Sequence, residues 1–141
     1  MRSKTPLVLM EQLVMVLVFA LAAALCVQAF TLADRRSRQV EAMDCALLEA
    51  QNAVETLKSC GGDYRETAEL CRGTWDGAEL CRFNNKDWKR EQEGNAAYVL
   101  TVTPAKSEDA LLGRAEVAVT DRSGELLCAL PAAWQEVDGH A

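Results

Sequence analysis

The cysteines are the side chains of this sequence with the widest chemical repertoire. The chain has six cysteines and one histidine. No two cysteines are separated by only two residues, so the spacing offers neither a zinc-binding pair nor a redox motif. No neighbour in the sequence is placed to lower a thiol pKa and create a nucleophile. In an oxidising compartment the thiols can form disulfides, and the candidates are Cys60, Cys71, Cys81 and Cys128, with their connectivity open.

The remaining polar residues do not assemble into a catalytic set. The one histidine, His140, is the penultimate residue, and no Ser–His–Asp arrangement can be built around it. The sequence has no glycine-rich phosphate-binding loop, and Glu91 and Glu93 lie in a polar stretch typical of a solvated loop. The net charge of -6 argues against nucleic acid as a partner. We therefore predict a non-enzymatic protein with no cofactor, metal or small-molecule ligand; an extracytoplasmic thiol enzyme is the weakest alternative.

Glu11 is the other residue with functional potential, because it lies within an apolar stretch. Between Leu7 and Phe30 the only polar residues are Glu11, Gln12 and Gln28. About 20 apolar residues in a helix span the hydrocarbon core of a membrane. A carboxylate in such a helix costs on the order of 1–3 kcal/mol, depending on its depth. Glu11 therefore either meets a partner in the membrane or reaches the head-group layer.

The apolar stretch is expected to form a helix, because the residues before it are typical of a helix start. Thr5 can cap the helix, and Pro6 suits its first turn. We expect a short basic leader over residues 1–6, which contains Arg2 and Lys4, and a transmembrane helix over 7–33. Two alternatives are open. One is a cleaved signal peptide ending at Ala29, and the other is a lipoprotein signal at Cys26, which the bulk of Leu25 disfavours.

The segment from Thr5 to Leu13, TPLVLMEQL, resembles the start of a type IV pilin or pseudopilin. In that family a peptidase removes a short basic leader, and a hydrophobic helix follows with glutamate as its fifth residue. A cut between Pro6 and Leu7 makes Glu11 the fifth residue here. Pro6 stands where the family has glycine, and Leu7 stands where it usually has phenylalanine.

The resemblance implies a role for Glu11 and a type of assembly. In the family this carboxylate pairs with the free N-terminal amine of a neighbouring subunit. Two opposite charges in a low-dielectric setting offset each other's burial cost, and the pair would set the axial stagger between subunits. The implied partners are membrane lipid and other pilin-like subunits.

After Phe30 the helical pattern continues into a polar, soluble region. Apolar residues recur at alternating spacings of three and four, which predicts one stripe of an amphipathic helix over 34–60: Val40, Met43, Leu47, Ala50, Val54 and Leu57. Gly61 and Gly62 provide its stop. We expect Asp34 and Arg38 to form an ion pair one helical turn apart.

The last part of the chain predicts a small sheet. Residues 61–95 are polar, contain cysteines and tryptophans, and are expected to form a variable loop, with a short strand near Ala78–Phe83. Residues 96–131 alternate in hydrophobicity and predict an antiparallel β-meander, in which Pro104 and Pro131 end strands. The expected fold is α+β: a long helix packed on a pilin-like meander of three to four strands, because neither surface can bury itself alone.

Charge alone does not orient the chain, because arginine and lysine flank both ends of the apolar stretch. The resemblance and the cysteine count favour a single-pass protein of the cell membrane with residues 34–141 as an extracytoplasmic domain. The first hypothesis is a minor pilin or pseudopilin in a type IV pilus, a type II secretion-like system or a DNA-uptake apparatus. The alternative is a solitary anchored or secreted binding domain that does not polymerise.

Overall fold

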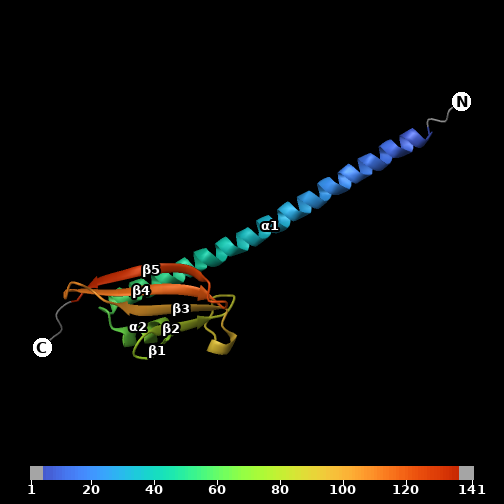
Figure 1. Ribbon diagram of the computed structural model, residues 1–141. Coiled ribbons are helices and arrows are strands. Elements are labelled where there is room, and N and C mark those ends of the chain that lie inside the picture. The colour runs from blue at the N-terminus through green and yellow to red at the C-terminus, as the bar shows by residue number, and fades with distance from the viewer. Residues whose placement is uncertain (1–4, 137–141) are drawn as a thin grey trace. The chain divides into compact units, whose positions relative to one another are not determined.

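The computed structural model describes residues 5–136 (Figure 1). The expected leader residues Arg2 and Lys4, as well as His140, lie outside the described residues. The chain divides into two units: an N-terminal unit, Met1–Val40, and a C-terminal unit, Glu41–Ala141. One helix, α1 (Thr5–Ser59), runs through the end of the first unit into the second. This confirms the predicted long N-terminal helix.

The part of α1 in the N-terminal unit is apolar, and its side chains are exposed rather than packed against other parts of the protein. Its most apolar window of 18 residues has a mean hydropathy of 2.6, and none of that window is buried inside the protein. A helix of this length and composition could cross a membrane. The expected pair is present, because Arg38 Nε lies 3.2 Å from the Asp34 carboxylate. Both side chains are more than half exposed, so the pair contributes at most about 0.5 kcal/mol to stability.

The C-terminal unit contains a five-stranded antiparallel sheet in the order β1-β2-β3-β4-β5. The strands are β1 (Thr74–Trp75), β2 (Leu80–Asn84), β3 (Tyr98–Ala105), β4 (Leu112–Asp121) and β5 (Leu126–Gln135). The predicted meander corresponds to β3, β4 and β5. The prediction of three to four strands was too low, because residues 61–95 supply two strands: β2, which overlaps the short strand expected near Ala78–Phe83, and β1, which was not expected.

Both prolines that were expected to end strands lie inside strands. Pro104 belongs to β3 beyond the last residue of β3 that pairs with β2, so the absence of its N–H breaks no bond to that strand. Pro131 lies in β5, which is an edge strand. An edge strand tolerates proline because one side of its backbone has no partner strand. The meander therefore continues to Gln135 rather than stopping near Leu130.

Residues 61–95 also contain two short helices, α2 (Tyr64–Cys71) and the 3-10 helix η1 (Glu93–Asn95). The predicted stop after α1 is confirmed, since Gly61 and Gly62 both have positive φ. Asp63 then caps α2, accepting hydrogen bonds from the backbone N–H groups of Arg65 at 2.9 Å and Glu66 at 3.2 Å. The glycine pair and this cap turn the chain sharply between two helices.

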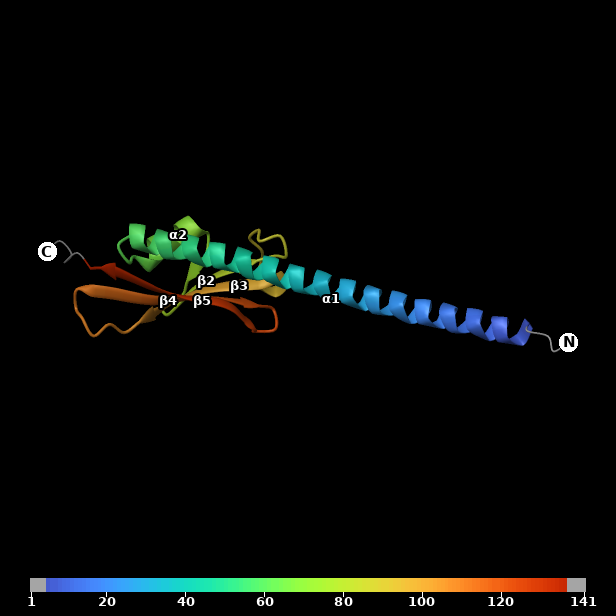
Figure 2. The ribbon, with the colours of Figure 1, turned by 90° about the horizontal axis from the view of Figure 1, so that it is seen from above.

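The core of the C-terminal unit lies between α1 and one face of the sheet, and Figure 2 shows α1 and α2 on that same face. The buried residues of α1 are mostly small: Ala46, Ala50, Ala53, Val54 and Leu57. The predicted stripe was therefore partly wrong, because Val40, Met43 and Leu47 are exposed. Alanines lie on the buried face instead, since small side chains let the helix backbone approach the branched residues of β3 and β4.

Candidate functional site

The residues expected to act in assembly all lie on the first turns of α1. Pro6 and Leu7 belong to the helix, and the Leu7 side chain is 75% exposed. Glu11 is also exposed, and within residues 5–136 no cationic side chain lies within ion-pair distance of it. The fold therefore presents a carboxylate, surrounded by exposed apolar side chains, to whatever medium or molecule contacts this helix.

The cysteines lie within the described residues, and all six are free thiols in the structure. Cys60 follows α1, Cys71 ends α2, Cys81 lies in β2 and Cys128 lies in β5. Cys60 is close enough to Cys71 to add to the rise in the Cys71 pKa that burial causes, and the Thr56 hydroxyl opposes that rise. Disulfide formation among the four candidates stays a prediction, because nothing in this arrangement tests it.

Burial makes three of the thiols in the C-terminal unit poor nucleophiles. It raises the pKa of Cys71 and of Cys128. Burial, together with the nearby Glu79 carboxylate, raises the pKa of Cys81 to about 11. The Cys81 sulfur lies 3.6 Å from Glu79 Oε1, a contact that favours the protonated thiol. Thiolate chemistry at neutral pH needs a lowered pKa, so these three sites do not favour a thiol enzyme.

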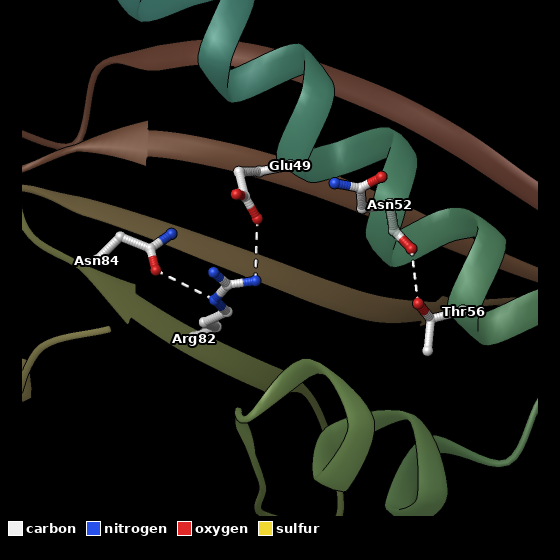
Figure 3. A network of polar contacts seen from close by, with 5 residues as sticks. All are labelled: Glu49, Asn52, Thr56, Arg82 and Asn84. Carbon is white, nitrogen blue, oxygen red and sulfur yellow. Dashed lines mark hydrogen bonds and ion pairs between the residues drawn. The ribbon is translucent and has the colours of Figure 1, made fainter. Parts of the chain in front are cut away.

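A polar network missed by the sequence analysis joins α1 to β2 (Figure 3). Arg82 Nη1 lies 2.9 Å from Glu49 Oε2, and both side chains are about one-fifth exposed. Arg82 Nε donates a hydrogen bond of 3.1 Å to Asn84 Oδ1. Asn84 is fully buried, and its Nδ2 has no hydrogen-bond partner among the described residues. The network fixes the position of the Arg82 guanidinium between the helix and the sheet.

The three tryptophans pack against aromatic neighbours or glycines. Trp75 stacks on Tyr64 with ring centroids 4.8 Å apart, and Trp88 stacks on Tyr98 at 4.2 Å. Trp134 meets Tyr64 edge to face at 6.2 Å. These contacts favour the interpretation of the tryptophans as packing residues. In that role the rings hold irregular segments of the chain in place.

The part of the chain that the structure describes has no group of three or more histidine, cysteine or acidic residues that could hold a metal ion. Comparisons with protein-family models, curated proteins and solved structures found no match to this chain. The proposals below therefore depend on the apolar helix, on Glu11 and on the folded C-terminal unit themselves.

Proposed function

We propose that the chain is a non-enzymatic structural subunit, similar to a minor pilin or pseudopilin, that assembles through its N-terminal helix. The assembly would be a type IV pilus, a type II secretion-like system or a DNA-uptake apparatus. One observation carries the proposal: a bare apolar helix with a single carboxylate near its start continues into a folded α+β unit. Such a helix suits both membrane residence before assembly and helix–helix packing after it.

The charge of Glu11 supplies the physical reason for assembly. A carboxylate exposed on an apolar helix is unfavourable in lipid, and a cationic partner offsets that cost. Cleavage between Pro6 and Leu7 would create a free amine, and the amine of a neighbouring subunit is a partner of the right charge. Subunits in a wrong axial register would leave both charges unpaired, so the pair would select one register.

Apolar side chains on α1 in the C-terminal unit support the same proposal. Met43 is 41% exposed, Leu47 is 38% exposed and Leu48 is 61% exposed. These residues lie beside the alanine face but do not join the core. Contact with neighbouring helices would bury the part of each side chain that is still exposed, which is worth about 25 cal/mol for each Å² of apolar surface removed from water.

A solitary membrane-anchored or secreted binding domain is the second candidate, and Pro6 favours it. The Pro6–Leu7 peptide bond lies in the first turn of α1 in the structure. Proline beside a scissile bond disfavours peptidase cleavage, and without cleavage no amine is created at Leu7. An uncut chain would remain an anchor with an extracytoplasmic domain and would have no assembly charge pair.

Extraction and protease accessibility test the membrane placement that both anchored candidates need. We expect the protein to stay in the membrane pellet after washing with alkaline carbonate. We also expect protease added outside spheroplasts to digest residues 41–136. A cytoplasmic control protein should survive the same treatment. Release of the intact protein by carbonate would contradict the anchor, and protection from external protease would contradict the extracytoplasmic orientation.

A further inference from the structure

Four cationic side chains gather around one cavity of the C-terminal unit. The cavity has a volume of about 510 Å³, and its wall includes Leu70, Arg72, Arg82, Trp88, Lys89 and Arg90. None of its lining residues is acidic. The net charge of the whole chain is -6, so this concentration of positive charge runs against the composition. We propose that this cavity binds the phosphate monoester group of an organic molecule.

The cations of the cavity differ in how they are held. Arg82 is fixed by Glu49 and Asn84, as described above. Arg90 forms a backbone bridge with Asn84, which places it beside Arg82 at the end of β2. Among the described residues, Arg72, Lys89 and Arg90 have no carboxylate within ion-pair distance. One guanidinium is thus pre-positioned, and three further cations keep their charge available for a ligand.

The backbone is strained on both sides of the cavity. Arg72 and Trp88 are the only non-glycine residues with positive φ within residues 5–136, at 55° and 59°. Arg72 is the left-handed cap of α2, a position that glycine occupies at lower cost. Trp88 is held by its stacking on Tyr98. The arginine at this cap is therefore present at a backbone cost that glycine would avoid, whereas stacking on Tyr98 offsets the cost at Trp88.

The chemistry of the cavity favours a phosphate monoester over a single carboxylate. A phosphate monoester carries a charge of about -1.5 to -2 at neutral pH and has three acceptor oxygens. Guanidinium groups bind such oxygens in a bidentate manner. Leu70 and Trp88 provide apolar surface for an organic portion, and the volume lies in the range of small-molecule sites. Glu91 and Glu93 line the adjacent cavity and would oppose a ligand that spreads in that direction.

Calorimetric titration of the full chain in detergent micelles tests this proposal, which is independent of the assembly role. The probes are inorganic phosphate, glycerol 3-phosphate, dibutanoyl phosphatidic acid and succinate. We expect saturable binding of glycerol 3-phosphate, tighter than that of inorganic phosphate and weakened by salt. Tighter binding of the short-chain lipid than of glycerol 3-phosphate would support the proposal and identify a lipid source. Absence of binding by every phosphate probe, or equal binding of succinate, would overturn it.

Two variants and one control locate the binding. Arg72→Gly should weaken glycerol 3-phosphate binding by about tenfold while the unfolding temperature stays equal or rises, because glycine suits the left-handed cap. Arg90→Gln should weaken binding by about as much. The control is Arg122→Gln, an exposed arginine of the β4–β5 turn, which should change affinity by less than about twofold. Unchanged binding in Arg72→Gly and Arg90→Gln, or an equal loss in Arg122→Gln, would overturn the proposed site.

Discussion

Substitution of Glu11 by alanine is expected to abolish incorporation of the protein into its assembly, with a loss of more than about tenfold. An opposite-charge pair 4 Å apart is worth about 4 kcal/mol at an effective dielectric constant of 20, and the variant loses this pair. Membrane insertion itself should improve slightly, because alanine removes a charge from the apolar helix. The measurement is the amount of protein in sheared or cross-linked assemblies, relative to the membrane pool.

Two controls separate assembly from folding in this experiment. Gln12→Ala changes the adjacent polar residue of the same helix and should leave incorporation near the wild-type level. The thermal unfolding of the C-terminal unit should be unchanged in Glu11→Ala, because Glu11 lies in the other unit. Incorporation of Glu11→Ala at the wild-type level would remove the assembly role of this carboxylate.

Substitution of Gly113 by alanine should strongly destabilise the folded unit. A Cβ atom at Gly113 would overlap the indole ring of Trp134, and a Cβ at Gly62 would overlap the same ring. Trp134 is only 9% exposed, and Tyr64 contacts its edge, so the ring has little room to move. We expect a loss of about 2–4 kcal/mol in the free energy of unfolding, measured by urea denaturation.

Gly94→Ala is the matched control for Gly113→Ala. No atom lies within 4 Å of a Cβ built at Gly94, and its φ is not positive, so the change should stay within about 0.5 kcal/mol. A double-mutant cycle with Trp134→Leu locates the cause. In the Trp134→Leu background Gly113→Ala should cost less than about 1 kcal/mol, because the bulky ring is gone. An equal cost in both backgrounds would mean that Trp134 does not cause the destabilisation.

The sequence predicts the elements whose pattern is strong and local. The long apolar run, the Gly61–Gly62 stop and the alternation of β3 and β4 each identified an element correctly. The face of α1 was harder to predict, because alanine is weakly hydrophobic and the larger Met43 and Leu47 dominated the pattern. Strand β2 was only partly predicted, because its buried side alternates Leu80 with the polar Arg82 and Asn84. Polar residues in such a pattern predict a loop, unless the tertiary partners of Arg82 and Asn84 are known.

One candidate site could be predicted from the sequence, and the others could not. Glu11 could be found from the sequence, because a charge in an apolar run stands out without any knowledge of tertiary structure. The Glu49–Arg82 pair and the cationic cavity could not, because their residues come from α1, α2, β2 and the loop before β3. Tertiary contacts bring these segments together, among them the Asn84–Arg90 backbone bridge and the pairing of β1 with β2. Arg72 and Arg90 in particular carry no sequence signal apart from their charge.

The mass of the intact protein extracted from membranes tests the central claim most directly, because it identifies the N-terminal residue. The assembly account predicts a chain that begins at Leu7, so that Glu11 is the fifth residue and a free amine is present for a neighbouring subunit. A chain that begins at Met1 would be an uncut anchor without that amine. A chain that begins at Phe30 would have lost α1 residues 5–29 as a signal peptide, and either result would contradict the assembly account.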